Sequence, residues 1–312
     1  MTAPTWRSQN TANSSTGTVS TDLAAGFQAN DILILTVGAE ETAGSIATPS
    51  GWTQIGTTLD SGSGTTGQKM AVFWKRATGS ETTFNVADSG VWTMSSMQAI
   101  SGCIASGDPV DAFQTITQSS ATSNISLPSL TTTTNDTLVL FTTVHGVGAA
   151  GAQFNSGYTY PPNIIAPNAK RTDYASDVGG LGQGGGTACW TATMGAAGST
   201  GGTFSATVGA PSNTRYCGFV IALKALDASI TDSDSGTGTE SESITGTAVD
   251  TDTGTGTESE AITIPNANSD SGVGTESENI VTQTHHYFGD NFNRDDESPL
   301  NISSSGAPWT NI

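Results

Sequence analysis

Short apolar runs bounded by turn residues recur along the chain from its start to about Leu226. Ile32–Val37 and Met70–Arg76 are the strongest of these runs, and each has the length and flanks of a buried strand. Thr82–Ala87 alternates apolar and polar residues, as half-buried strands do. No window shows a sustained helical period with caps. The pattern predicts an all-β protein, with a β-sandwich or jelly-roll head rich in β-branched residues.

The pattern of the head recurs within the head. Asn30–Leu35 is echoed 105 positions later by Asn135–Leu140, and Ala77–Phe84 is echoed 120 positions later by Ala197–Phe204. We therefore expect two similar halves, at about 15–105 and 122–226, in a head that covers residues 1–226. One such half would leave an apolar face open, so the halves are predicted to pair into one sandwich. Two separate small domains are the alternative.

The two offsets differ, which indicates extra residues in the second half. We expect an insertion of about 14 residues between Pro161 and Ala188. This range contains the glycine-rich segment Gly179–Gly186, which has the composition of an insertion loop.

One repeat unit is written three times after the head. Its recurrent aliphatic positions are Ile244, Ile262 and Ile280, which are evenly spaced along the chain. We expect residues 227–284 to form an acidic β stalk in which strands alternate with Asp-x-Gly-x-Gly turns. One aliphatic residue per unit cannot bury a core alone, so we expect a homo-oligomer, preferably a trimer, in which these isoleucines meet.

Charge is distributed unevenly along the chain. The formal net charge is −19, and residues 227–312 hold sixteen Asp and Glu residues against Arg294 as the one basic residue. Nucleic acid is therefore not expected as a partner, because phosphate binding needs clustered Lys and Arg. No run is long and apolar enough to suggest membrane insertion, and the first residues do not resemble a secretory signal.

Residues that could carry catalysis are sparse. Histidine occurs at His145, His285 and His286, and the chain has no GxSxG, HExxH or P-loop motif. The three cysteines form neither a CxxC pair nor an even set, which favours buried free thiols. We expect a protein that is not an enzyme and that needs no cofactor.

The repeats contain the candidate metal site. On a strand, alternate acidic residues of one unit would share a face, and carboxylate oxygens suit calcium. The alternative is that these carboxylates are solvated and protect strand edges from aggregation. The candidate calcium ligands are Asp234, Glu240, Glu242, Asp252, Glu258 and Glu260.

Aromatic residues supply candidates for carbohydrate binding. Most of them, Tyr160 and Trp190 included, lie on or beside predicted strands, where core packing is the expected role. Trp52 and its counterpart Tyr158, 106 positions later, each follow a turn. These two are the candidates for an exposed rim that stacks on sugar rings.

Several segments resemble known protein families. Asn30–Leu35, Pro49–Thr53 and Ala71–Ser80 resemble a β-rich module of phage tail and fibre proteins that also occurs in some bacterial surface proteins. The Asp-x-Gly-x-Gly-Thr-Glu-Ser repeats look like those of minor tail proteins from phages of actinobacteria. Phe288–Arg294 looks like the first strand of a concanavalin-like or laminin-G-like module, so residues 285–312 are expected to begin a lectin-like module that is incomplete.

The resemblance implies a structural protein located in the virion, a minor tail or tail-fibre protein with a role in particle assembly and host-surface adhesion. Its expected partners are other tail proteins, copies of itself and a host surface glycan. The alternatives are a bacterial surface adhesin and a glycan depolymerase.

Overall fold

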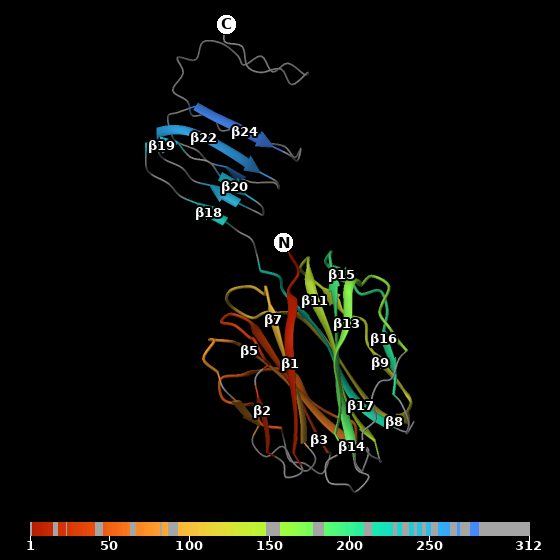
Figure 1. Ribbon diagram of the computed structural model, residues 1–312. Coiled ribbons are helices and arrows are strands. Elements are labelled where there is room, and N and C mark those ends of the chain that lie inside the picture. Colours follow the sequence, from red (N-terminus) through yellow and green to blue (C-terminus); the bar gives the residue numbers. More distant parts are fainter. Residues whose placement is uncertain are drawn as a thin grey trace. The chain divides into compact units, whose positions relative to one another are not determined.

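A computed structural model describes the head and the strands of the repeats (Figure 1). In the head it describes residues 2–14, 18–22, 24–40, 46–62, 67–81, 83–86, 93–147, 157–176, 184–208 and 214–226. Beyond the head it describes the backbone of short strands between 230 and 280. The chain divides into two compact units, Met1–Leu226 and Asp227–Ile312.

The first half of the head contains a five-stranded antiparallel sheet of order β1-β7-β3-β5-β4. Central strand β3 is buried on both faces, as its unbroken apolar run predicts. The strands are β1 (Thr5–Ser14), β3 (Ile32–Glu40), β4 (Thr53–Asp60), β5 (Gln68–Arg76) and β7 (Thr93–Ser101).

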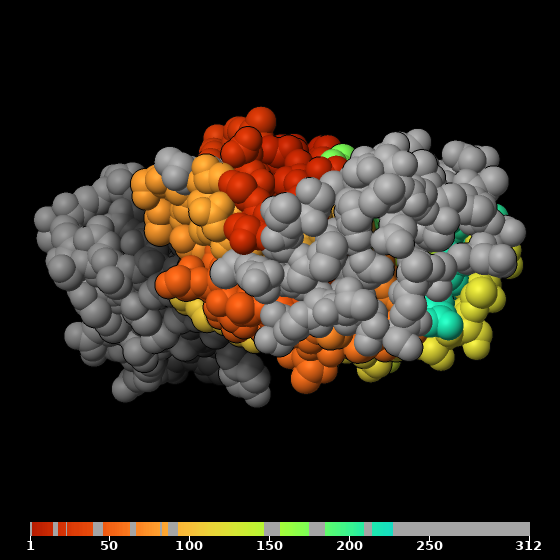
Figure 2. Space-filling view, turned by 90° about the horizontal axis from the view of Figure 1, so that it is seen from below, coloured from red at the N-terminus to blue at the C-terminus, as the bar shows by residue number. Residues whose placement is uncertain are grey.

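The second half contains another five-stranded antiparallel sheet, of order β13-β14-β11-β17-β8. Yellow and teal surface, from the parts of the chain that hold the neighbours β8 and β17, lies together in the space-filling view (Figure 2). The strands are β8 (Val110–Thr122), β11 (Thr137–Val147), β13 (Ile165–Ser176), β14 (Gly184–Met194) and β17 (Thr214–Leu223).

Small sheets cover the outer faces of the two large ones. β2 (Val19–Asp22) pairs with β6 (Thr83–Val86) in the first half. In the second half β9 (Asn124–Leu127), β12 (Tyr158–Thr159) and β16 (Phe204–Thr207) form a sheet of order β12-β16-β9, and β10 (Thr131–Thr132) pairs with β15 (Gly198–Ser199).

Three apolar cores separate the resulting four layers (Figure 1). The central core joins the two large sheets through residues such as Ile34 and Leu140. One outer core lies under β2 and β6 and includes Phe73, and the other lies under β9 and β16 and includes Trp190. Alternation along each central strand sends successive side chains to different cores.

The two halves share one topology, which confirms the prediction of a β-sandwich head built from two similar halves. Replacing β1, β3, β4, β5 and β7 by β8, β11, β13, β14 and β17 converts the order of the first sheet into that of the second. Equivalent residues meet at the centre, where the hydroxyls of Thr36 and Thr142, 106 positions apart, lie 3.1 Å from each other and are buried. Contacts between the sheets pair β5 with β17 and, equivalently, β14 with β7, as an approximate two-fold axis requires.

The glycine-rich segment accounts for only two of the extra residues of the second half. Asp60 pairs with Lys69, and the equivalent pair of the second half is Ala175 with Gly186, so eight residues separate the strands in the first half and ten in the second. The offset changes earlier, because Thr53 and Ala169 occupy equivalent places opposite Trp74 and Thr191. Most of the extra residues therefore fall between Tyr158 and Ala169, directly after the aromatic candidate Tyr158.

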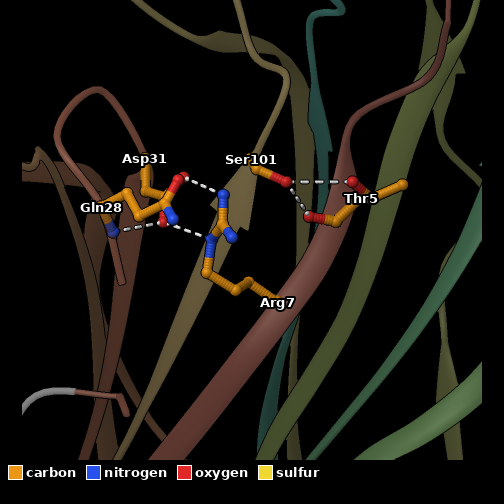
Figure 3. A network of polar contacts seen from close by, with 5 residues as sticks. All are labelled: Thr5, Arg7, Gln28, Asp31 and Ser101. Atoms are coloured by element: carbon orange, nitrogen blue, oxygen red, sulfur yellow. Dashed lines mark hydrogen bonds and ion pairs between the residues drawn. The ribbon is translucent and has the colours of Figure 1, made fainter. Parts of the chain in front are cut away.

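Extra residues in edge strands tie these strands to the turns before β3 and β11. The register of β1 shifts at Arg7, whose guanidinium donates from Nε to Asp31 Oδ2 (2.7 Å) and from Nη2 to Asp31 Oδ1 (3.2 Å) (Figure 3). The backbone N–H of Gln28 donates to the same carboxylate (2.8 Å). Beside this group, the hydroxyls of Thr5 and Ser101 lie 3.0 Å apart across β1 and β7 (Figure 3).

In the second unit, each strand pairs in parallel with the equivalent strand of the next repeat. β18 (Ile230–Asp232), β21 (Ala248–Asp250) and β23 (Ala267–Asn268) form one ladder, and β22 (Thr255–Ile262) joins β19 (Thr237–Thr239), β20 (Glu242–Ile244) and β24 (Thr275–Ile280) in another. Each described pair joins residues 18 positions apart, such as Thr237 with Thr255 and Thr257 with Thr275. Each repeat unit is thus one rung of a parallel ladder within a single chain.

This pairing changes two expectations for the repeats. Gly238 and Gly256 lie within β19 and β22, so the Asp-x-Gly-x-Gly stretches are not entirely turns. Neighbouring rungs also supply backbone hydrogen-bond partners within the chain, so these strands do not need a second chain to pair with. The trimer and the stalk stay predictions. The expected lectin-like module at 285–312 lies outside the described residues.

Candidate binding site on the second half

An aromatic group lies at the start of the inserted residues. Tyr158, on the edge strand β12, is 39 % exposed, and its ring centroid lies 5.9 Å from that of Tyr160 and 6.3 Å from that of Trp190. The interplanar angles are 86° and 52°, so neither neighbour is stacked flat on Tyr158. Phe204 lies behind, 5.4 Å from Tyr160 and 4.8 Å from Trp190, and anchors the group in the outer core.

The inserted residues hold this group in place. Asn163 donates from its backbone N–H to Thr200 O (3.1 Å) and from Nδ2 to Ser199 O (2.9 Å). Ile164 packs against the outer core, and Ile165 is 49 % exposed at the start of β13. The insertion therefore packs against the second half and adds an exposed rim to it.

Tyr160 carries an unusual hydroxyl. Its Oη is buried and has no hydrogen-bond partner among the described residues. Burial raises the pKa of this phenol, with Tyr158 and Cys189 adding to the effect, so the hydroxyl stays protonated at neutral pH. A buried hydroxyl without a partner costs about 1–3 kcal/mol, and such a group in a native protein is a candidate for contact with water or a ligand.

An ion pair lies on the neighbouring edge strand. Lys170 Nζ is 2.7 Å from Asp173 Oδ2, and the two side chains are 29 % and 12 % exposed. Lys170 lies opposite Trp190 in the ladder and Asp173 lies opposite Ala188, so both are on the face of the sheet that carries the aromatic group. The surface defined by Tyr158, Tyr160, Lys170 and Asp173 is called the Tyr158 surface below.

Trp52 does not belong to an exposed rim, which corrects the expectation for that residue. It is 6 % exposed and lies in the outer core of the first half. The ring of Phe84, from β6, contacts it edge to face with centroids 4.7 Å apart. Of the two carbohydrate candidates, only Tyr158 presents a ring to solvent.

The acidic and aliphatic candidates of the repeats are ordered by register. Glu242 pairs with Glu260, which pairs with Glu278, and Glu258 pairs with Glu276. Ile244, Ile262 and Ile280 follow one another in the same ladder. Asp234, Glu240 and Asp252 lie outside the described residues. Calcium binding and isoleucine contacts between chains therefore stay predictions.

The cysteines of the head are not activated. Cys103, Cys189 and Cys217 are free and buried, and burial raises the pKa of each thiol to about 12. They are therefore protonated at neutral pH, whereas a nucleophilic cysteine needs its thiolate form. His145 is buried on β11. Within the described part of the chain, no group of three or more His, Cys, Asp or Glu residues could hold a metal ion.

The sequence pattern does not indicate Lys170 and Asp173 as site residues, whereas the core packing expected for Tyr160 is confirmed, since its ring packs against the outer core. The signal that could have found this surface is the repeated aromatic of Tyr158-Thr159-Tyr160, placed where the offset between the halves changes. Among the described residues, no helix is long and apolar enough to cross a membrane.

Comparison with known proteins finds no matching family model, no matching curated protein and no matching solved structure. Any function assigned to this chain is therefore argued from its own residues and from the resemblance of its motifs.

Proposed function

We propose that this chain is a non-enzymatic structural protein of a virus particle, a minor tail or fibre protein that contributes to assembly and to host-surface adhesion. The head supplies the adhesive surface, and the repeats act as a spacer. The rungs of the repeat ladder are the observation that carries the proposal, because a segment built of stacked equal units is lengthened or shortened by whole rungs without a new core.

Two further observations support the proposal. The head is a doubled sandwich with three apolar cores, an arrangement suited to a rigid support for surface loops and insertions. The acidic repeats, with sixteen carboxylates and one basic residue over residues 227–312, repel one another and keep such chains soluble and apart.

Particle composition tests the proposal. Virions are purified from the source of the gene by density-gradient centrifugation, and an antibody against residues 1–226 is applied for gold labelling and electron microscopy. We expect label on tails or fibres and co-sedimentation of the chain with infectivity. Chain confined to the soluble fraction would contradict the structural role.

A second assay addresses catalysis. The purified full chain is incubated with host cell-wall polysaccharide, and reducing ends are measured over time. We expect no release above that of a heat-denatured sample. Release of reducing ends would replace the structural proposal by that of a depolymerase.

A further inference from the structure

We propose that the Tyr158 surface binds one pyranose ring of a glycan, with the ring stacked on Tyr158 and its hydroxyls held by Lys170 and Asp173. The inference rests on the proposed adhesive function and names its ligand class and its site. It also predicts one sugar site per chain, on the second half alone, although the head has two similar halves.

The aromatic ring supplies the apolar part of the site. One face of a pyranose presents C–H groups, which pack on the π face of an exposed aromatic side chain. Tyr158 is exposed and is not stacked flat on Tyr160 or Trp190. Contact with Trp190 and, through Tyr160, with Phe204 restrains the ring, which lowers the entropy lost on binding.

The ion pair supplies the polar part. Sugar hydroxyls both donate and accept hydrogen bonds, and a carboxylate beside an ammonium group offers one partner of each kind. Lys170 and Asp173 are already 2.7 Å apart and partly exposed, so a ligand bridges an existing pair and need not assemble a new one.

The first half has an ion pair of its own, between Lys75 and Glu81, but among its described residues it lacks the exposed aromatic ring. At the place of Tyr158 it has Trp52, buried beneath Phe84, and it has no counterpart of the inserted Tyr160. Gln54, which occupies the place of Lys170 opposite Phe73, has no carboxylate partner in its described hydrogen bonds. The structural difference between the halves thus predicts the stoichiometry.

Saturation-transfer NMR and isothermal titration on the full chain test the inference. The probes are the methyl glycosides of glucose, galactose, mannose and N-acetylglucosamine, followed by oligosaccharides of whichever gives a signal. We expect one site per chain, with Tyr158→Ala weakening binding at least about tenfold, a change of about 1.4 kcal/mol. Tyr158→Phe should stay within about threefold of the native affinity, because stacking does not need the hydroxyl.

Matched variants separate the site from general effects on the fold. Phe113→Ala removes another aromatic that is 40 % exposed, on β8, and should leave sugar affinity unchanged. Asp173→Asn and Lys170→Met should each weaken binding, and thermal unfolding of every variant confirms that the head is folded. Sugar binding that survives Tyr158→Ala in a folded head, two sites per chain, or no binding by any probe would overturn the inference.

The outcome is independent of the particle experiment. A chain that is present in virions but binds none of the sugars contradicts only the sugar site. A chain that is absent from virions and binds sugar through Tyr158 contradicts only the structural role.

Discussion

The two halves of the head fill equivalent buried positions with different residues. In the first half Thr21 of β2 and Ser95 of β7 place their hydroxyls 2.5 Å apart in a buried hydrogen bond. The equivalent positions of the second half are Leu127 of β9 and Gly218 of β17, and a side chain at Gly218 would collide with Leu127. A polar pair of two small residues is thus equivalent to one large apolar residue and one glycine.

A second pair of equivalent positions also holds residues of different chemistry. The extra residue of β1 is Arg7, which binds the buried carboxylate of Asp31, and the extra residue of β8 is Asp111. Asp111 accepts hydrogen bonds from the Thr133 N–H (2.7 Å) and hydroxyl (2.5 Å), before β11. Arg7 and Asp111 carry opposite charges, but each one binds the turn that leads into the central strand of its half.

Topology and apolar volume are thus retained between the halves, while the polar chemistry at each position varies. The insertion after Tyr158 follows the same rule, because it leaves the five-stranded sheet intact and changes only what the outer face displays.

The largest effect is expected from the outer cores. Phe73→Ala should lower the free energy of unfolding by about 3–5 kcal/mol, because the ring is fully buried. Trp190→Ala, at the equivalent place in the second half, should cost a similar amount. Since the central core joins both sheets, calorimetry should show one transition that moves as a whole in both variants.

Phe113→Ala is the control for that prediction, since a ring that is 40 % exposed should contribute only about 1 kcal/mol. Two resolved transitions, of which each variant shifts only one, would show that the halves fold as separate domains.

A large effect is also expected from exchanging the polar and apolar pairs between the halves. Leu127→Thr alone should cost about 2–4 kcal/mol, because it leaves a cavity and a buried hydroxyl without a partner. Gly218→Ser alone should cost about 1–3 kcal/mol through the collision with Leu127. The double variant recreates the Thr21–Ser95 pair and should cost at least about 1 kcal/mol less than the sum of the two.

Denaturant unfolding of the four proteins completes this double-mutant cycle. Strict additivity would mean that the two positions are not coupled and that the equivalence between the pairs is only geometric.

The sequence predicted the parts of this fold that depend on local periodicity. The apolar run Ile32–Val37 lies within β3, and the repeated offsets found the two halves. It failed where distant segments decide the outcome. Trp52 is buried by Phe84, which belongs to the later strand β6, and no local pattern around Trp52 indicates this.

The polar part of the candidate site was also beyond local reasoning. Strict alternation would place Lys170 and Asp173 on opposite faces of a strand, since they are three residues apart. The register shift between Lys170 and Thr172 places Arg171 as an extra residue and brings both onto one face. A bulge of this kind depends on the partner strand, and the same limit hid the parallel pairing of the repeats.

A moderate effect is expected at the edge-strand bulges. Arg7→Met should lower the free energy of unfolding by about 2–3 kcal/mol, because it leaves the Asp31 carboxylate, which is 4 % exposed, without its bidentate partner. Asp111→Asn, the equivalent change in the second half, keeps one acceptor oxygen and should cost about 1 kcal/mol. Urea unfolding at neutral pH measures both variants. A larger loss of unfolding free energy in Asp111→Asn would show that the Asp111 contact stabilises the head more than the Arg7 contact does.

A smaller effect than that of Arg7→Met is expected from Glu81, and it depends on pH. The turn Ala77–Glu81 is tied by one carboxylate, since Glu81 Oε1 accepts from Thr78 N–H (2.8 Å) and lies 3.2 Å from Lys75 Nζ, while Oε2 accepts from Gly79 N–H (2.9 Å). Burial alone would raise the pKa of Glu81, but these hydrogen bonds outweigh it and lower the pKa to about 2. In the second half, Gly201 occupies this place and Asn163 of the insertion binds the turn instead.

Because the pKa of Glu81 is lower in the folded than in the unfolded protein, its contribution is complete above about pH 4.5 and is lost as the pH falls towards about 2. Glu81→Gln should therefore lower stability by on the order of 1–2 kcal/mol at pH 7, after allowance for solvent screening, and by almost nothing at pH 2. Ser80→Ala, in the same turn, removes a hydroxyl that does not titrate and should show a difference that is constant with pH. Urea unfolding at pH 7, 4 and 2 measures all three proteins, and a Glu81→Gln difference that persists at pH 2 would show that side-chain packing, not the ionised carboxylate, holds this turn.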